Sequence, residues 1–391
     1  MGWRAERRPT GPGPVMSVVI VLDGAGPDRF SVAVSPLAEL AASLHVLTEH
    51  AHHAKHAGWA TAVVGTAPPE FRAGLRRFAP LWTALRWRAF YPGLGGPVSG
   101  GPVSGGPGTG GPGLGMPLAG LSLDRFAELT AYTCASGYGG FDFGRVLRDT
   151  GQAAVLRQTA AALPEPHLAL AEDLLRAPEL LRADVLGFLD LSRRVFFGDL
   201  WAETAPTLTR AAHRVRRLLA DRGPAVALVS LSPSSARLTR PSAPGADGPT
   251  RVVFDKVHQA VISPARTPVL LIPTRYGAPH LLVKNEPGLP PVVHFPVDAP
   301  AVGVTLARAR LLALTDPSRV RLCRLIARQA MTNADLADRL GMTRPQVSRH
   351  LRVLRDLGLA QVERSGRYVH YRLDLAVVER IGGDLATALQ Y

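Results

Sequence analysis

Cysteine is nearly absent from this sequence of 391 residues, since only Cys134 and Cys323 occur. The two lie far apart in the chain and form no Cys-x-x-Cys pair, which argues against a disulfide scaffold and against a zinc site built on thiolates. A reducing compartment fits this composition. We therefore expect a cytoplasmic protein.

Long hydrophobic runs and familiar catalytic motifs are lacking as well. No stretch approaches the roughly 18 consecutive apolar residues that span a bilayer, so no membrane contact is expected. The apolar run from Val15 to Leu22 is short and ends at Asp23 without a cleavage pattern, which favours a strand over a signal peptide. No G-x-S-x-G, Walker loop, dinucleotide fingerprint or H-E-x-x-H is present. These absences favour a protein that is not an enzyme and that needs no cofactor.

Lysine is scarce, occurring only at positions 55, 256 and 284, so the formal net charge of +14 comes almost wholly from arginine. A strongly basic chain favours polyanionic partners. The positions of the arginines therefore matter more than their number.

The first residues predict small elements of mixed type. Residues 1–14 lack apolar periodicity and are expected to be disordered, whereas the run SVVIVLDG predicts a strand that pairs with residues 29–35 across a turn at 24–28. Ser35-Pro36 then provides a cap and a proline in the first turn of an amphipathic helix. Its apolar positions are Leu37, Leu40, Ala41, Leu44 and Leu47.

The middle of the chain predicts helices followed by strands. Residues 92–117 are a repetitive Gly/Pro-rich insertion, expected to be disordered and to carry no chemistry. Residues 121–222 are mostly helical in pattern and end in a charged surface helix that stops at Gly223-Pro224. Five β-rich runs between 225 and 296 then predict a small sheet: AVALVSLS, RVVFD, PVLLIP, HLLVKN and PVVHFP. A linker at 297–303 follows, so we expect an N-terminal regulatory domain at 15–300.

Two consecutive capping boxes mark the region after this linker. Asp316 precedes Pro317 at the start of one helix, Thr332 to Asp335 caps the next, and Gly341 ends it in a left-handed conformation. Thr343 to Gln346 caps the following helix, whose apolar residues Val347, Leu351 and Leu354 recur at helical spacing. This spacing is that of a helix-turn-helix, whose second helix can enter a major groove about 12 Å wide.

A basic, polar surface accompanies these helices. The run AQVERSGRYVHYRLD alternates on both sides of Ser365-Gly366 and predicts a β-hairpin. Residues 344–372 contain seven arginines against two acids, which concentrates +5 of the net charge there. We predict contacts to double-stranded DNA from the polar side chains of the second helix, its cap and the hairpin tip: Thr343, Arg344, Gln346, Ser348, Arg349, Arg352, Arg364 and Arg367.

The segments LTDPSRVRLCRLI, LADRLGMTRPQVSRHLRVLRDLGL and VERSGRYVHYRL resemble, in order, the winged-helix domain of the ArsR/SmtB family of bacterial regulators. The resemblance covers residues 305–391 and implies a DNA-binding domain at 304–391. It also implies a homodimer interface made by helices around Leu306–Leu314 and Leu375–Leu389. More loosely, residues 17–300 resemble the uncharacterised N-terminal domain fused to such winged helices in actinobacterial-type regulators.

The expected fold class is α+β: a mostly helical N-terminal domain with a small β-sheet, followed by a C-terminal winged helix-turn-helix. The expected function is a homodimeric, sequence-specific transcriptional regulator, a repressor on an inverted repeat, with an unidentified small-molecule effector bound or sensed by the N-terminal domain. The junction of helices and sheet is where such a domain commonly binds ligands.

Metal binding is the main alternative. Metal-sensing members of the resembled family carry Cys or His ligands that residues 332–340 and the last helix lack, so we expect no metal site. His45, His52, His53 and His56 include a pair four residues apart that could bind a divalent ion on one helix face, although a solvated helix end is the favoured interpretation. A metal-dependent enzyme or sensor that uses the His45–His56 cluster and carries an appended DNA-binding tail therefore stays open. A nucleoid-type architectural protein is a third hypothesis.

Overall fold

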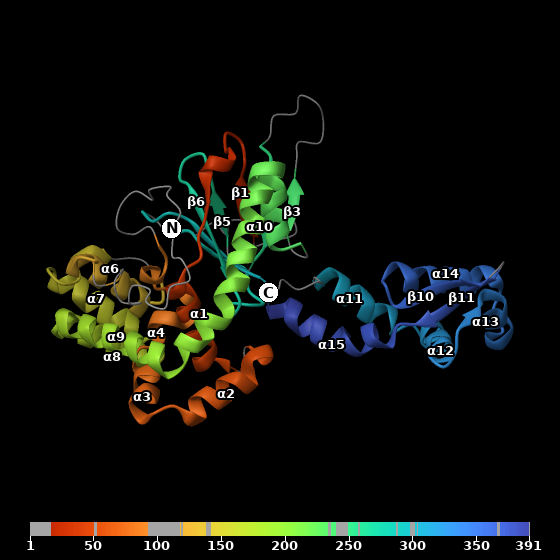
Figure 1. The fold of residues 1–391 in the computed structure, drawn as a ribbon, viewed down its shortest axis with the longest axis horizontal. Helices are drawn as coiled ribbons and strands as arrows, with labels where there is room; N and C mark the ends of the chain where they lie inside the picture. The colour runs from red at the N-terminus through yellow and green to blue at the C-terminus, as the bar shows by residue number, and fades with distance from the viewer. Residues whose placement is uncertain are drawn as a thin grey trace, which may run out of the picture. The chain divides into compact units, whose positions relative to one another are not determined.

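The chain forms two compact units (Figure 1). The first comprises Met1–Leu231 with Arg237–Ala299, and the second comprises Pro300–Tyr391 with the short segment Ser232–Ala236. The computed structural model describes residues 17–50, 53–92, 118, 120–137, 142–233, 236–239, 249–256, 259–286, 288–297, 302, 304–365 and 368–390. The N-terminal residues 1–14 and nearly all of the Gly/Pro-rich insertion at 92–117 lie outside the described residues. In fold class the chain is α+β, as the sequence predicted.

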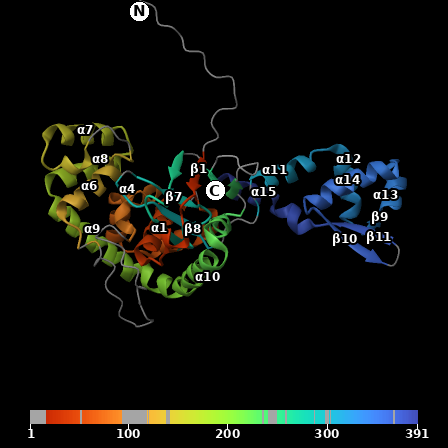
Figure 2. The same ribbon diagram turned by 90° about the horizontal axis from the view of Figure 1, so that it is seen from above.

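Helices make up most of the first unit. They are α1 (Pro36–Thr48), α2 (Ala57–Thr66), α3 (Pro69–Arg77), α4 (Ala79–Trp82), α6 (Leu123–Cys134), α7 (Thr150–Ala161), α8 (Glu165–Arg176), α9 (Pro178–Ser192) and α10 (Gly198–Leu231). The short 3-10 turns η3 (Ala54–His56), η4 (Thr83–Leu85), η5 (Arg88–Phe90) and η6 (Phe143–Arg145) and the π turn η7 (Arg193–Phe197) lie between these helices, whereas η1 (Pro27–Arg29) precedes them. Helices α6 to α9 gather on one side of this unit in both views (Figures 1 and 2).

The strands of the first unit form two sheets instead of the one that the sequence predicted. Strands β3 (Ala236–Thr239), β4 (Arg251–Asp255), β1 (Ser17–Val21) and β5 (Ala260–Ile262) follow one another in the first sheet. The second sheet has the order β2 (Phe30–Val32), β6 (Val269–Thr274), β8 (Val292–Pro296) and β7 (Leu282–Lys284). The predicted strands RVVFD, PVLLIP, HLLVKN and PVVHFP are thus confirmed.

The predicted hairpin between the first two strands is wrong. β1 pairs antiparallel with β4 and parallel with β5, whereas β2 pairs parallel with β6. Val18 and Ile20 are fully buried, so the apolar side chains of β1 pack in a core that long-range partners complete. The turn between β1 and β2 suggested that the two strands pair with each other. Their actual partners β4, β5 and β6 lie more than 200 residues further along the chain.

Helix α1 begins where the sequence predicted, with the Ser35 hydroxyl accepting a hydrogen bond from the Ala38 amide at 3.2 Å. It is not amphipathic, because every residue from Leu37 to Leu47 is buried. Glu39 lies within this run, and its Oε1 accepts from the backbone amides of Arg275 and Tyr276, both at 2.9 Å. Burial raises the pKa of Glu39, and these hydrogen bonds and Thr274 oppose that shift.

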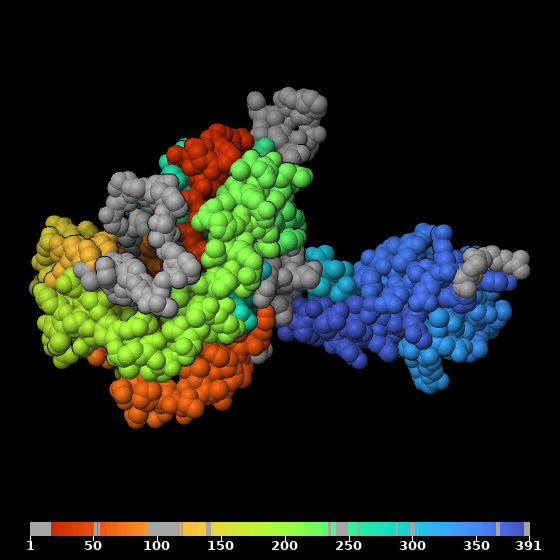
Figure 3. Space-filling model, viewed as in Figure 1, coloured from red at the N-terminus to blue at the C-terminus, as the bar shows by residue number. Residues whose placement is uncertain are grey.

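Helix α10 corrects a second prediction. Its direction breaks at Gly223, where φ is +78° and ψ is 172°, but it resumes at Pro224 and continues to Leu231. The run AVALVSLS is therefore helical and not a strand, and Ala227, Leu228 and Leu231 are buried at helical spacing. Short apolar runs cannot be assigned to helix or strand by periodicity alone. Figure 3 shows α10 as a continuous band across one face of the first unit.

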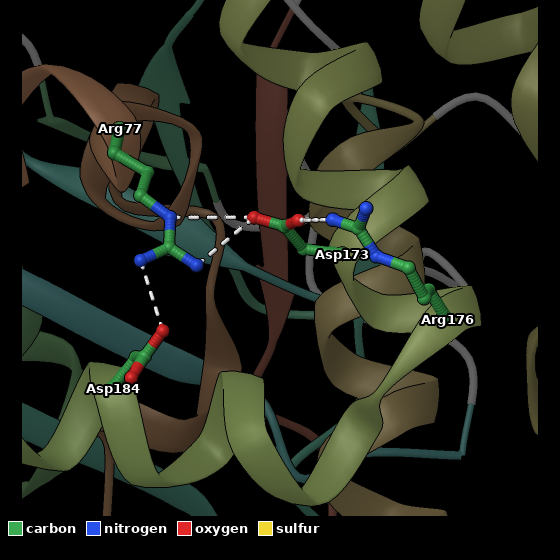
Figure 4. A network of polar contacts seen from close by, with 4 residues as sticks. All are labelled: Arg77, Asp173, Arg176 and Asp184. Carbon is green, nitrogen blue, oxygen red and sulfur yellow. Dashed lines mark hydrogen bonds and ion pairs between the residues drawn. The ribbon is translucent and has the colours of Figure 1, made fainter.

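Aromatic packing joins helices of the first unit. The ring of Phe188 stacks on Phe71 at 5.5 Å and on Trp82 at 5.6 Å between centroids. A Cβ on Gly74 would lie 2.3 Å from a Phe188 ring carbon, so this close approach of α3 to α9 requires glycine. At the surface, Arg77 of α3 pairs with Asp173 of α8 at 3.0 Å and with Asp184 of α9 at 2.9 Å (Figure 4). Such exposed pairs each stabilise a fold by about 0–1 kcal/mol, so the aromatic core dominates.

The second unit is a small helical domain with a three-stranded sheet. Its elements are α11 (Val304–Ala313), α12 (Pro317–Ile326), β9 (Met331–Thr332), α13 (Asn333–Leu340), α14 (Arg344–Asp356), β10 (Ala360–Ser365), β11 (Tyr368–Leu373) and α15 (Leu375–Gln390). β11 pairs antiparallel with both β10 and β9. Leu322, Ile326, Leu336, Val347 and Leu354 are fully buried at the centre of its core. Across both units, no described helix is long and apolar enough to cross a membrane.

Candidate nucleic-acid interface

The turn between α13 and α14 is built as the capping boxes predicted. Thr332 Oγ1 accepts from the Asp335 amide at 3.3 Å, and the Asp335 carboxylate accepts from the Thr332 amide at 3.1 Å. Gly341 ends α13 in the left-handed region with φ +62° and ψ 35°, a conformation that glycine adopts with little strain. The hydrogen bonds to Asp335 lower the pKa of its carboxyl group.

The second capping box fixes the start of α14. The Thr343 amide donates to Gln346 Oε1 at 2.8 Å, and Thr343 Oγ1 accepts from the Gln346 amide at 3.4 Å. Thr343 and Gln346, both predicted to contact DNA, are thus already engaged with one another, although both are exposed. Val347, Leu351 and Leu354 are buried, which confirms the predicted apolar face.

The opposite face of α14 presents the predicted polar residues to solvent. Arg344, Ser348, Arg349 and Arg352 are exposed. No hydrogen bond or ion pair to another described residue holds Arg344, Arg349 or Arg352, whereas Arg355 on the same helix pairs with Asp356 at 2.9 Å. A guanidinium without a protein partner is available for a phosphate or a guanine edge.

The predicted hairpin is confirmed as β10 and β11, paired from Ala360 with Leu373 to Ser365 with Tyr368. Arg364 lies near its end and is exposed, but Gly366 and Arg367 lie outside the described residues. Tyr368, 54% exposed at this end, was not singled out from the sequence. The alternating pattern does not predict that Tyr368 is exposed, because an aromatic residue in a strand is normally expected to be buried.

Arg310 is another residue that sequence reasoning missed. Its Nε donates to the Leu357 carbonyl at 3.0 Å, just past the end of α14, and its Nη1 pairs with Asp384 of α15 at 3.3 Å. The guanidinium therefore fixes α11 and α15 to the end of α14. No sequence pattern points to this contact, because its partners lie 47 and 74 residues away.

Helices α11 and α15 also carry exposed apolar side chains. Val304, Leu311 and Leu312 of α11 are 41%, 44% and 47% exposed, and Leu375 of α15 is 49% exposed. These residues fall within or beside the two segments from which we predicted a dimer interface.

The two cysteines are buried, as expected for Cys323. Burial raises the pKa of the Cys323 thiol to about 11, which disfavours the reactive thiolate.

The histidine cluster differs from its sequence-based interpretation as a solvated helix end. His45, His53 and His56 are 8%, 1% and 8% exposed, and the rings of His45 and His53 meet edge to face at 5.1 Å. They do not share one helix face, because α1 ends at Thr48 and the later histidines follow a break. Within the parts of the chain that the structure describes, which exclude His52, no group of three or more His, Cys, Asp or Glu side chains could hold a metal ion.

A winged helix-turn-helix with an exposed basic second helix defines the class of the second unit. Residues 316–362 match the model of the bacterial regulatory protein, arsR family, and residues 16–301 match the family of unknown function DUF5937. The chain belongs to the DUF5937 family and carries an ArsR-family helix-turn-helix domain at its C-terminal side.

Curated relatives each match about a fifth of this chain. The transcriptional repressor SmtB homolog of Synechocystis sp. is 40% identical over 78 residues, which cover 20% of this chain and 59% of the relative. A probable mercury resistance operon repressor of Streptomyces lividans is 34% identical and covers 20% of this chain and 67% of the relative. The HTH-type transcriptional regulator CmtR of Mycobacterium bovis is 40% identical over 80 residues, which cover 20% of this chain and 68% of the relative. The chain thus spans roughly six to seven tenths of these relatives' lengths.

Among solved structures, an ArsR-like transcriptional regulator from Rhodococcus sp. RHA1 is 26% identical. It matches 21% of this chain and 76% of that chain with a TM-score of 0.20.

Proposed function

We propose that the protein is a sequence-specific transcriptional repressor that binds double-stranded DNA as a homodimer on an inverted repeat. The observation that carries this proposal is the exposed face of α14, where Arg344, Arg349 and Arg352 have no described protein partner. The names of the curated relatives, which include repressors, support the direction of regulation. The protein would act in the cytoplasm, where its DNA target lies.

Arg349 is the residue that we propose reads a base. It projects from the middle of α14, away from the buried Val347 and Leu351. A guanidinium at such a position can contact guanine O6 and N7 together, which is worth about 1–3 kcal/mol of discrimination. Arg364 and Arg367 of the hairpin would instead hold phosphates, because a wing lies beside the groove that the second helix occupies.

Competition binding against a randomised DNA library tests this proposal. We expect selection by the wild-type protein to return an inverted repeat, and Arg349→Ala to flatten preference at one symmetric position per half-site. Arg355→Ala is the matched control, since Arg355 lies on the same helix but pairs with Asp356. If the ranking of sequences is the same in Arg349→Ala and wild type, Arg349 does not read a base. If the library returns no preferred sequence at all, the architectural hypothesis replaces the repressor.

The homodimer rests on the exposed apolar residues of α11. Leu311 and Leu312 are both more than 40% exposed, and an apolar surface of this kind is commonly covered by a second copy. Replacing both by Glu should convert the dimer into a monomer in sedimentation and weaken binding to two half-sites more than to one. Dimers that persist in this double variant would place the interface elsewhere.

We further propose that the first unit is the effector domain. Its two sheets and surrounding helices form a core of their own, separate from that of the second unit. Chelation with EDTA should leave DNA binding unchanged. Loss of binding that added Zn²⁺ restores would instead support the metal-sensor alternative.

A further inference from the structure

Positive charge gathers in the first unit where residues 84–91 lie against strands β7 and β8. The side chains that meet there are Arg86, Arg88, Tyr91, Tyr132, Lys284, Glu286 and His294, which we call the cationic cluster. They come from four separate parts of the chain: the segment around η5, helix α6, the end of β7 and strand β8.

The inner side chains of the cationic cluster are buried. Arg88, Tyr91 and His294 are 2%, 4% and 0% exposed. The guanidinium carbon of Arg88 lies 5.7 Å from the centre of the Tyr91 ring, and the Tyr91 and His294 rings meet edge to face at 5.7 Å. Burial lowers the pKa of His294 to about 3, so this imidazole is neutral.

The outer residues of the cationic cluster are only partly buried, although the Glu286 side chain is just 12% exposed: Arg86, Tyr132, Lys284 and Glu286. Arg86 and Tyr132 lie together against Gly137, because a Cβ built there would be 2.8 Å from Arg86 Nη1 and 2.9 Å from Tyr132 Oη. Lys284 donates to the Ala84 carbonyl at 2.7 Å.

Charge in the cationic cluster is not balanced. Glu286 pairs with Arg88 at 3.0 Å, and Arg88 also donates to the Pro290 carbonyl. Three cations and one carboxylate leave two positive charges in the cationic cluster. Partial removal from water, together with Arg86 and Arg88, lowers the pKa of Lys284 to about 8, against the opposing effect of Glu286.

Several buried polar atoms of the cationic cluster have no hydrogen-bond partner among the described residues. They are Arg86 Nε, Arg88 Nε, Tyr91 Oη and both ring nitrogens of His294. Most buried polar atoms in proteins are paired, so a group of unpaired polar atoms, most of them donors, beside surplus positive charge is unusual. Surplus charge and spare donors are what a negatively charged group requires.

The backbone beside Arg86 is also strained. Ala84 and Leu85 have backbone φ angles of +49° and +50°, which residues other than glycine rarely adopt. Strained residues persist only where the surrounding structure holds them, and they gather at ligand sites. Lys284 donates to the carbonyl of Ala84, so this lysine contacts the strained backbone as well as contributing charge.

We propose that the cationic cluster binds a small organic anion through a carboxylate or phosphoryl group. Arg86 belongs to the partly exposed side of the cluster and its guanidinium suits two oxygens of one anion, and Lys284 provides a second positive charge. The Tyr132 hydroxyl, which lies with Arg86 Nη1 against Gly137, supplies a further hydrogen-bond donor. The role of this anion as an effector rests on the proposed regulatory function, whereas its binding does not.

Thermal unfolding of the full chain without DNA tests the binding alone. Inorganic phosphate and succinate are titrated separately against sodium chloride of equal ionic strength. A saturable rise in Tm with phosphate alone indicates a phosphoryl ligand, with succinate alone a carboxylate ligand, and with both an anion site of either kind. No saturable rise with either anion overturns the proposal.

Matched variants separate a site from general attraction to a basic protein. Arg86→Gln should weaken binding of the active anion at least tenfold, whereas Arg214→Gln, an exposed arginine on α10, should leave it unchanged. Equal weakening by both variants would overturn the proposal. Should Arg86→Gln fail to fold, as judged by circular dichroism, Lys284→Gln serves in its place with the same expectation.

Two further readouts test the charge of the cationic cluster. Glu286→Gln removes the competing carboxylate and should tighten anion binding several-fold. As the pH rises from 7 to 9, affinity in the wild type should fall relative to that in Lys284→Gln, because Lys284 loses its proton near pH 8 and the comparison removes the titration of the anion itself. Weaker binding in Glu286→Gln with intact fold, or the same pH dependence in wild type and Lys284→Gln, would contradict the proposal.

If the anion is the effector, it should change affinity for the selected operator, and Arg86→Gln should abolish that change. Anion binding without any change in DNA affinity would leave the site in place and refute only its regulatory role.

Discussion

Helices α1 and α14 are both 13 residues long, and both begin with a hydroxyl cap and a proline in the first turn. Their surroundings differ completely. Eleven consecutive residues of α1 are buried, whereas α14 buries only Val347, Leu351 and Leu354. The same local signals therefore start a helix that supports a core and a helix that presents ten side chains to its surroundings. Capping residues determine where a helix begins, and the residues between the caps determine whether it is buried in a core or exposed at the surface.

Truncating an apolar side chain should give the largest difference in stability between variants of the two helices. Leu44→Ala in α1 removes a fully buried side chain and should lower the free energy of unfolding of the first unit by about 2–5 kcal/mol. Val353→Ala in α14, where the side chain is 38% exposed, should change stability by no more than about 0.5 kcal/mol. All five tryptophans lie between residues 3 and 201, so their fluorescence in urea titrations follows the first unit, and far-UV circular dichroism in the same titrations also follows the helices of the second. Comparable losses in the two variants would remove the contrast.

Removing the caps should instead affect both helices alike. Ser35→Ala and Thr343→Ala each delete a hydroxyl that accepts a backbone amide and should each cost about 1 kcal/mol. Circular dichroism during chemical denaturation measures the loss. Replacement by Asp, which can also cap, should restore most of it, and failure of that rescue would mean that the hydroxyl acts through other contacts.

Acid should act on the two units with opposite signs. The pKa of Glu39 is raised by burial, so its contribution to stability is fully present below the unfolded value of about 4.3 and is lost as the pH rises through the folded pKa. Asp316 and Asp335 have lowered pKa values, so their contribution is present above about 3.9 and is lost as the pH falls through the folded pKa. We measure the free energy of unfolding from pH 7 to 3. Its dependence on pH should be weaker in Glu39→Gln and in Asp335→Asn than in the wild type, and the two variants should lose contributions of opposite sign. Lost contributions of the same sign would contradict these assignments.

The smallest effect on stability should come from the exposed face of α14. Arg352→Ala should leave Tm nearly unchanged while weakening DNA binding and making its dependence on salt shallower by about one unit per monomer. Fluorescence anisotropy with labelled DNA at several salt concentrations measures this. An unchanged salt slope would exclude a phosphate contact.

Local signals were the most informative part of the sequence. The starts of α1, α13 and α14 follow from caps at Ser35, Thr332 and Thr343, because a cap acts within four residues. The apolar face of α14 was predicted for a similar reason, since its spacing repeats within one helix. These features of the fold and of the candidate interface depend on neighbours in the chain.

What could not be predicted depends on distant partners. The pairing of β1 with β4 and β5 has no local signature, so adjacency in sequence suggested a hairpin instead. The cationic cluster was missed because Arg86 and Lys284 lie almost 200 residues apart and each alone resembles a solvated surface charge. The helical run after Gly223 was missed because a mainly apolar run of eight residues fits either period.

The long-range pairing of β1 has a consequence for synthesis of the chain. Val19 pairs with Val253, so the ribosome adds roughly 230 residues before the partner exists. At about 5–20 residues per second, β1 waits on the order of 10–50 s as an unpaired apolar segment. The second unit has its three strands within 43 residues, from Met331 to Leu373, and needs only about 2–9 s. A nascent chain is therefore exposed to aggregation mainly through its first strand, and a chaperone that holds residues 17–21 during translation would protect the whole first unit.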